Sequence, residues 1–183
     1  EQLVVTREYE ASLRVLRTTG ATIGEMDSLS RRVAVSIYMN PDVQHLMEDE
    51  EDSDLYDILT RLTRLDSLRI YNPMIDSIII YNGSKDITYD SQKLIYAGRN
   101  PFAEAENGTP TPRLTPVYRR TVHPLTDGYS DVWSEQFAYA NYAIEGRNVS
   151  HGMVVSVDAE WLISSVKRIG DADNDYDLYL LDG

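Results

Sequence analysis

Seven side chains that could bind a small polar molecule lie on, or at the end of, strands that the sequence predicts. They are Tyr89, Asp90, Tyr118, Arg120, Trp133, Phe137 and Tyr139. An aromatic ring, an Arg guanidinium and a carboxylate on one concave sheet face would hold a sugar or a small carboxylate. The alternative is that many of these rings simply belong to the core. The chain has 13 Tyr but only 2 Phe, and Tyr keeps a hydroxyl for a polar partner.

Position along the predicted strand 132–140 selects the side chains that would face the ligand. Neighbouring residues of a strand point to opposite faces, so Trp133, Phe137 and Tyr139 share one face. We predict that the ligand lies there, with a mono- or oligosaccharide as the first choice and a carboxylate as the second. If Trp133 belongs to the core instead, the expected site moves to the Pro-rich segment 91–116.

The sequence indicates neither catalysis nor a bound metal. It has no Cys, no glycine-rich phosphate loop, no HExxH motif and no Gly-flanked Ser elbow, and its three His residues are far apart. Asp171, Asp173 and Asp175 match the first ligand positions of a calcium loop, but Tyr176 replaces the required Gly. A paired-carboxylate hydrolase would fit an acidic chain, yet no pair is singled out. We therefore predict that residues 171–177 form an acidic linker, and that the chain has no catalytic residues, metal or cofactor.

Charge and hydropathy narrow the classes of partner. With 17 Lys and Arg against 30 Asp and Glu, the net charge is −13, which disfavours binding to nucleic acid. The hydrophobic fraction of 42% suits a folded globular domain. The longest apolar run has four residues, Ile78 to Tyr81, and a membrane span needs about 20. Because the chain starts at Glu1 without Met, we expect it to be a fragment whose flanking parts include the membrane-bound segments.

The first half of the chain predicts two helices. Residues 1–40 carry an interrupted apolar seam and end at Asn40-Pro41, because a residue before Pro avoids the helical region. This long helix could lie on its own domain, or could continue from a membrane span and pair with a second copy. Residues 42–52, which contain the acidic run 48–52, predict a solvated loop. Ser53 is then the expected N-cap of a second helix with an apolar stripe over 55–68.

The period then changes from helical to two-residue alternation near Asn72. Predicted strands cover 76–81, 86–90, 117–122, 132–140, 152–158 and 178–181, and residues 159–168 predict a short helix. Asn82-Gly83 suits the positive backbone angles of a tight hairpin turn. Segment 91–116, with its Pro residues, predicts a long irregular excursion. The expected fold is α+β, with the long N-terminal helix beside an antiparallel sheet of about five strands.

Several segments resemble a known family of sensor domains. They are Ile75 to Asn82 after a Leu-rich helix, Tyr89 to Ser91, Asp131 to Ser134, Gly152 to Val157 leading into Trp161-Leu162, and Leu180 to Gly183. This order resembles the extracellular Cache-type (PAS-like) sensor regions of Gram-positive membrane receptors. The resemblance implies a long helix over 1–40, a membrane-distal sensor module over 41–170, and the start of a membrane-proximal module over 171–183.

The resemblance also implies a function and leaves alternatives open. The implied parent is a sensor histidine kinase paired with an AraC-type regulator, or else a membrane-anchored AraC-type regulator. The domain would lie on the extracellular face of the membrane, bind a small polar ligand and form a homodimer through the long helix. An Arg followed closely by Trp-Tyr, known in amino-acid-binding Cache domains, is not matched by Arg119-Arg120-Thr121. A secreted binding or adhesion module without signalling output is the other class.

Overall fold

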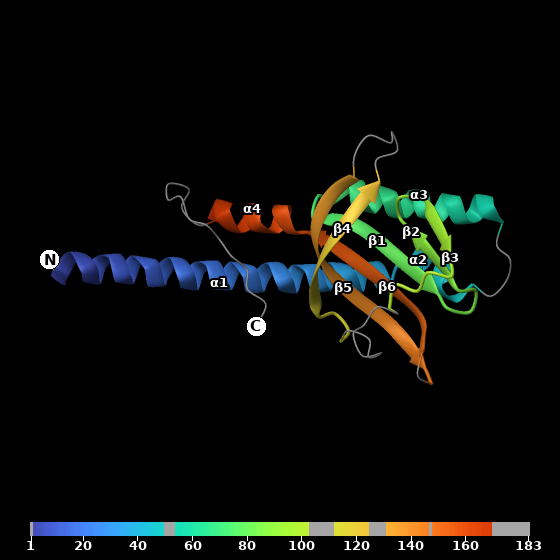
Figure 1. Ribbon diagram of the computed structural model, residues 1–183, viewed down its shortest axis with the longest axis horizontal. Coiled ribbons are helices and arrows are strands. Elements are labelled where there is room, and N and C mark those ends of the chain that lie inside the picture. Colours follow the sequence, from blue (N-terminus) through green and yellow to red (C-terminus); the bar gives the residue numbers. More distant parts are fainter. Residues whose placement is uncertain (1, 50–53, 103–111, 125–130, 147, 170–183) are drawn as a thin grey trace.

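The computed structural model describes residues 2–49, 54–102, 112–124, 131–146 and 148–169. One antiparallel sheet of six strands carries helices on one face, and a long helix runs across that face and projects well beyond it (Figure 1). The helices are α1 (Gln2–Tyr38), α2 (Pro41–Glu48), α3 (Leu55–Tyr71) and α4 (Ala159–Ile169). The strands are β1 (Ile75–Asn82), β2 (Ile87–Asp90), β3 (Leu94–Ala97), β4 (Pro116–Pro124), β5 (Asp131–Glu145) and β6 (Asn148–Asp158). The predicted α+β fold is confirmed.

The sheet has the strand order β3-β2-β1-β6-β5-β4, so β1 and β6 form its centre. β1 is antiparallel to both β2 and β6, with a register shift between Ile75 and Ser77. β5 pairs with β6 over most of its length and with β4 on its other side. The sheet has one strand more than predicted, because β3 lies inside the segment 91–116 that was expected to be irregular. Four residues are too few to show a period.

The end of α1 agrees with the sequence, but the acidic segment after it begins with a helix that was not predicted. The Asn40 side chain accepts a hydrogen bond from the Asp42 N–H at 2.8 Å and caps α2, and Pro41 occupies the first helical position. Val43, Leu46 and Met47 are the buried face of this short helix. Only three apolar residues in eight mark it, so the expectation of a loop from residue 42 onward was wrong up to Glu48.

α3 begins where the sequence predicts a helix, but the structure gives it a different N-cap. The Asp54 side chain accepts a hydrogen bond from the Tyr56 N–H at 3.3 Å, so Asp54 is the cap. Ser53, the predicted cap, lies outside the described residues. Leu62 and Leu65 are the buried residues of the predicted apolar stripe, whereas Leu55 and Leu68 are exposed. α3 therefore covers the sheet with only part of the stripe.

The turn after β1 differs from the tight hairpin that Asn82-Gly83 predicted. The positive φ of 50° is at Asp86, and the connection to β2 spans four residues. Asn82 is fully buried, and its amide donates to the Asp49 carbonyl oxygen at 2.9 Å. A Cβ on Gly83 would lie 2.3 Å from the Ser150 carbonyl oxygen. Gly83 is thus required by close approach to β6 and not by a left-handed backbone.

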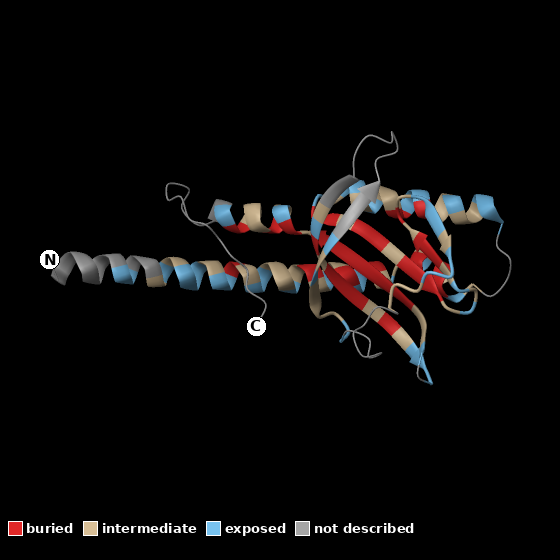
Figure 2. Cartoon of the chain, viewed as in Figure 1, coloured by how far each residue is buried: buried red, intermediate tan, exposed pale blue. Residues whose placement is uncertain are grey.

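The main core lies between the helices and one face of the sheet, where Figure 2 shows buried residues along the strands and on the facing helices. Its fully buried side chains include Leu46 and Leu62 from the helices and Ile78, Met153 and Val155 from the sheet. Burying each such aliphatic side chain contributes about 1.5–3 kcal/mol. The helix-facing side of the sheet therefore contributes mainly to the stability of the fold.

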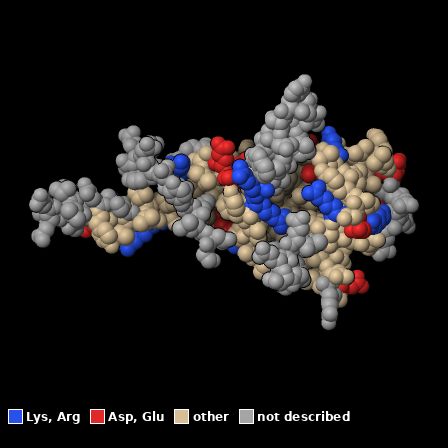
Figure 3. All heavy atoms as spheres, viewed as in Figure 1, with Lys and Arg blue, Asp and Glu red and all other residues tan. Residues whose placement is uncertain are grey.

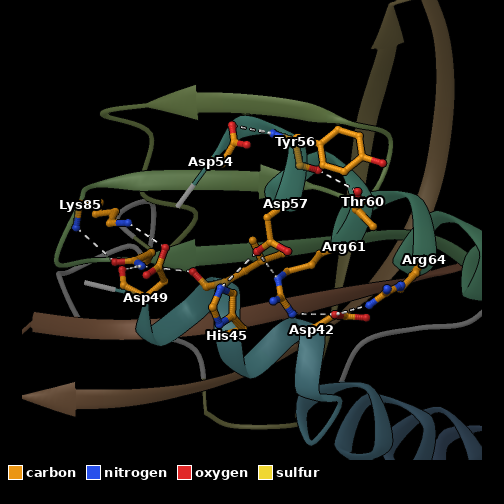
Figure 4. Close-up of polar contacts among 12 residues, drawn as sticks. Asp42, His45, Asp49, Asp54, Tyr56, Asp57, Thr60, Arg61, Arg64 and Lys85 are labelled. Atoms are coloured by element: carbon orange, nitrogen blue, oxygen red, sulfur yellow. Dashed lines mark hydrogen bonds and ion pairs between the residues drawn. The ribbon is translucent and has the colours of Figure 1, made fainter. Parts of the chain in front are cut away.

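A network of charged side chains fastens α2 to α3 at the edge of this core (Figure 4). Asp42 Oδ1 accepts from Arg61 Nη1 at 2.9 Å and from Arg64 Nη1 at 3.3 Å. Arg61 Nε also donates to Asp57 Oδ2 at 2.8 Å, and His45 Nε2 lies 3.5 Å from the same oxygen. The two helices are thus joined by side chains from both.

Two sequence predictions fall partly or wholly outside the described chain. The expected strand 178–181 lies outside the described residues, as does the acidic linker 171–177. The division into units 1–40, 41–170 and 171–183 stays a prediction. Among the described residues, no helix combines the length and the apolar character that a membrane span requires.

Candidate functional site

The face of the sheet turned away from the helices carries a second, smaller core. Its buried members are Ala138, Ala140, Tyr142 and Val154, packed with Ile79, Phe102 and Val149. No residue of a described helix belongs to this cluster. Neighbouring residues of a strand point to opposite faces, so even-numbered residues of β5 lie on this helix-free face and odd-numbered ones face the helices. Since these side chains are buried although no described helix covers them, other parts of the chain cover the helix-free face, and Phe102 is one of them.

Three aromatic rings meet on the helix-free face and form what we call the aromatic cluster. They are Tyr81 of β1, Tyr142 of β5, and Phe102 in the segment after β3. The Phe102 ring lies 6.1 Å from that of Tyr81 and 5.4 Å from that of Tyr142, both in tilted or edge-on contact. Gly152 of β6 makes room for it, because a Cβ there would lie 2.7 Å from Phe102 Cζ. The cluster holds the segment that follows β3 against the sheet.

Further along the strands from the aromatic cluster, the same face buries polar side chains. Ser77, Ser156 and Gln136 are between 2 and 4% exposed, and they come from the neighbouring strands β1, β6 and β5. Ser77 pairs in register with Ser156, which pairs in turn with Ala138. The Gln136 amide donates to Asp76 Oδ2. Buried polar groups placed among apolar and aromatic side chains are the usual composition of a small-molecule site.

Cationic side chains also gather on this side, although the chain is acidic overall (Figure 3). The Arg113 guanidinium carbon lies 5.2 Å from the centre of the Tyr142 ring, and that of Arg99 lies 5.2 Å from the Tyr96 ring. A guanidinium over an aromatic face keeps its N–H groups directed outward for other acceptors. The helix-free face can therefore offer stacking, hydroxyl and amide hydrogen bonds, and positive charge.

The structure places two of the seven predicted site residues in the helix-facing core. Tyr89 and Tyr139 are each 1% exposed and belong to the main core cluster. The Tyr139 hydroxyl donates to Asp27 Oδ1 of α1 at 3.1 Å. Burial is the main reason why the pKa of Tyr139 rises to about 12, with Asp27 adding to the rise and a hydrogen bond with Ser30 opposing it. These two rings pack against helices.

The other predicted residues do not form a single surface. Tyr118 and Phe137 pair across β4 and β5 on the helix-facing side, with ring centres 5.8 Å apart, and Tyr118 is 49% exposed. Arg120 follows Tyr118 by two residues and so shares its face. Asp90 pairs with Ile79 and lies on the helix-free face instead. Trp133 of β5 pairs with Val122 of β4, and the Trp133 side chain lies outside the described part of the structure.

Among the predicted residues whose side chains are described, Asp90 alone lies on the helix-free face. A binding role for the seven residues stays a prediction. Sequence reasoning missed Tyr81, Phe102, Gln136 and Tyr142. For Gln136 and Tyr142 the only signal was alternation along β5, and the odd-numbered set that contains Phe137 and Tyr139 shows the same alternation.

A groove lies on the helix side of the sheet. It has a volume of about 230 Å³ between the end of α1, the end of α3 and the start of β1, and it is lined by Val33, Ser36, Ile37, Asn40, Leu68, Asn72 and Ile75. Asn40 already caps α2 with its side chain. The groove offers mostly apolar walls and less polar chemistry than the helix-free face.

Comparison with known proteins supports the fold. No protein-family model and no curated protein matches the chain. Among solved structures, the extracellular domain of a protein described as a histidine kinase is similar, with a TM-score of 0.58 and 12% identity over 88% of this chain and 61% of that one. A domain of a protein described as a sensory box/GGDEF family member from Vibrio parahaemolyticus has a TM-score of 0.57 and 9% identity, covering 86% and 63%.

A third similar structure is the sensory domain of the Campylobacter jejuni chemoreceptor Tlp3 with isoleucine bound. Its TM-score is 0.51 and its identity 12%, over 92% of this chain and 68% of that one. At such identities the likeness concerns the fold alone. The chain spans about three fifths of the length of the first two structures.

Proposed function

We propose that this chain is the extracellular ligand-sensing domain of a transmembrane signal-transduction receptor, with a two-component histidine kinase as the output. The observation that carries the proposal is the helix-free face, which buries Ser77, Gln136 and Ser156 as well as the aromatic cluster. The apolar row of Ile79, Ala140 and Val154 lies between the two groups. A sheet face that served stability alone would bury apolar side chains there. The three similar structures, described as extracellular or sensory domains or as part of a sensory-box protein, support the same assignment.

The proposed ligand is a small polar molecule, with a sugar first and a carboxylate second. Sugars stack on aromatic faces such as those of Tyr81 and Tyr142, while their hydroxyl groups pair with Ser, Gln and Asp side chains. Asp90, which lies on the helix-free face, is the predicted site residue that fits this place. Arg113 on Tyr142 would favour a carboxylate. Because the Campylobacter domain binds isoleucine, amino acids form the third class to be tested.

The proposed receptor context follows from α1. Its 37 residues span about 55 Å at 1.5 Å per residue, which is longer than the sheet needs. We propose that α1 relays ligand binding and pairs with the α1 of a second copy. The domain would lie at the extracellular face of the membrane, held through segments that flank this sequence. A membrane-anchored AraC-type regulator and a secreted binding module are the alternatives.

A thermal-shift screen of the chain against monosaccharides, oligosaccharides, dicarboxylates and amino acids, isoleucine included, tests the proposal. A ligand at a hundred times its Kd stabilises the native state by about 2.7 kcal/mol. The hit is then titrated against Gln136→Met, which removes the buried amide. Gln92→Met, in the turn between β2 and β3, is the matched control. Equal affinity of the two variants would remove the site from the helix-free face, and no hit in any class would count against sensing of small polar molecules.

A further inference from the structure

The fully buried positions of α1 hold mostly small side chains. Among its described residues these are Thr22, Ser30, Ala34 and Ile37. The Thr22 hydroxyl donates to the Thr18 carbonyl oxygen at 3.0 Å, and the Ser30 hydroxyl donates to that of Met26 at 2.8 Å. Both hydroxyls thus bond within α1 itself. Larger apolar side chains of α1, such as Met26, Leu29 and Val33, are partly buried and pack against the main core. Apolar contacts are non-directional, so they do not select one partner atom for α1 on the sheet.

A polar contact supplies what this packing lacks. The Tyr139 hydroxyl reaches from β5 to Asp27 Oδ1 at 3.1 Å, and Arg31 Nε holds the other carboxylate oxygen of Asp27 at 2.8 Å. Ser30 adjoins the same hydroxyl. Asp27, Ser30 and Arg31 are spaced so that they lie on one side of the helix. A phenol that is 1% exposed is therefore surrounded by three residues of α1 at one point.

Tyr139 and its two neighbours in β5 connect this contact to the opposite face of the sheet. Its neighbours Ala138 and Ala140 point to the helix-free face and belong to the cluster there, while Tyr139 points to α1. Three consecutive residues of one strand thus reach both the candidate ligand face and the long helix. A displacement of β5 caused by a ligand on the helix-free face would therefore move the Tyr139 hydroxyl relative to Asp27.

We propose that Tyr139 is a positioning residue whose hydrogen bond to Asp27 fixes α1 on the sheet and couples the helix-free face to α1. The coupling to ligand rests on the proposed function, whereas the fixing of α1 does not. Gly20 and Gly24 precede Asp27 by one to two turns, and no side chain or backbone atom lies within 4 Å of a Cβ built on either. Thr22 is buried and Ile23 packs against the main core, so the contact at Asp27 lies near the N-terminal end of the packed part of α1.

Amide hydrogen exchange of the whole chain without ligand tests the inference, so its outcome does not depend on the ligand screen. Tyr139→Phe removes only the hydroxyl, and loss of one hydrogen bond is expected to speed exchange of α1 amides near Asp27 about fivefold. Amides of β5 and β6 should keep their wild-type rates. Tyr89→Phe is the matched control, because Tyr89 is equally buried on the same face and belongs to β2.

Asp27→Ala provides the second arm and does not disturb the core. The double variant Tyr139→Phe/Asp27→Ala should exchange no faster than the more affected single variant, because both remove the same bond. The sequence has no Cys, so Glu25→Cys with Ile144→Cys allows spin-label distances between α1 and β5, which should broaden in Tyr139→Phe and not in Tyr89→Phe. Wild-type α1 exchange in Tyr139→Phe, uniform acceleration of α1 and sheet amides, or additive effects of the two substitutions would overturn the proposal.

Discussion

Arg61 Nη1 of α3 donates to Asp42 Oδ1 of α2 at 2.9 Å, with only 21 and 14% of the two side chains exposed. This contact joins two helices whose remaining interface is small. It also holds the carboxylate of Asp42 in a place where water cannot replace a lost partner fully. The pair therefore has more effect on stability than an exposed ion pair, and its removal is the first prediction.

Arg61→Met should lower the free energy of unfolding by about 1.5–3 kcal/mol, because a partly buried carboxylate loses its main charged donor. Arg64→Met is the matched control on the same acceptor. Arg64 is 65% exposed and 3.3 Å from Asp42, so its loss should cost below about 0.5 kcal/mol. Urea unfolding of both variants measures the difference. Equal destabilisation would show that the buried geometry of Arg61 has no special effect.

Stability at high pH should depend on Tyr139. Its pKa is raised to about 12 from 10.0, mainly by burial, so between these values the native state keeps a proton that the unfolded chain has released. The contribution is complete below pH 10 and is lost as the pH rises toward 12. The difference in unfolding free energy between wild type and Tyr139→Phe should shift by roughly 2–3 kcal/mol in favour of Tyr139→Phe over this window. Parallel pH profiles of the two proteins would contradict the prediction.

Two Gly→Ala substitutions should change the stability of the fold in opposite directions. At Gly152 the new Cβ would lie 2.6 Å from Tyr142 Cβ, so Gly152→Ala should destabilise by about 1–3 kcal/mol and displace Phe102. Gly24→Ala meets no atom within 4 Å and should stabilise α1 by about 1 kcal/mol. Thermal unfolding by circular dichroism gives both values. A destabilised Gly24→Ala variant would reveal a role for that glycine beyond helix propensity.

Trp133→Ala separates two roles for a ring that the sequence singles out. As a ligand platform, Trp133 should be needed for binding of the hit from the thermal-shift screen and little needed for stability. As a core residue, it should instead cost roughly 3–5 kcal/mol of stability when truncated. Because the proposed site lies on the helix-free face with the even-numbered residues of β5, we expect retained affinity. Affinity and melting temperature measured on this single variant decide, and lost affinity with retained stability would move the site to the Trp133 face.

Signalling through α1 should depend on helical phase. One residue inserted at Gly20 rotates the preceding part of the helix by about 100° relative to the sheet. In the full receptor we expect an altered output with unchanged ligand affinity, because the sheet and the aromatic cluster are not touched. An unchanged output would exclude relay by rotation or shift of α1.

Local patterns were sufficient for most of the elements. The seam over 1–40, the Asn40-Pro41 stop, the stripe of α3 and the alternation of β1, β4, β5 and β6 each arise from interactions between near neighbours in the chain, so the sequence shows them. α2 and β3 escaped detection because eight residues among acids and four exposed residues carry too little periodicity. The α+β class followed from the order of these elements.

The sequence did not decide which face of each strand meets the helices. Even- and odd-numbered residues of β5 both include aromatic side chains, so alternation defined two sets without saying which one meets the helices. That choice is made by contacts between residues far apart in sequence, such as Tyr139 with Asp27 and Tyr142 with Phe102. Only the pairing of β1, β5 and β6 and the packing of α1 on one side decide it. For this reason the sequence alone indicated a polar and aromatic sheet surface, whereas the tertiary structure assigned Tyr139 to the helix and Gln136 to the helix-free face.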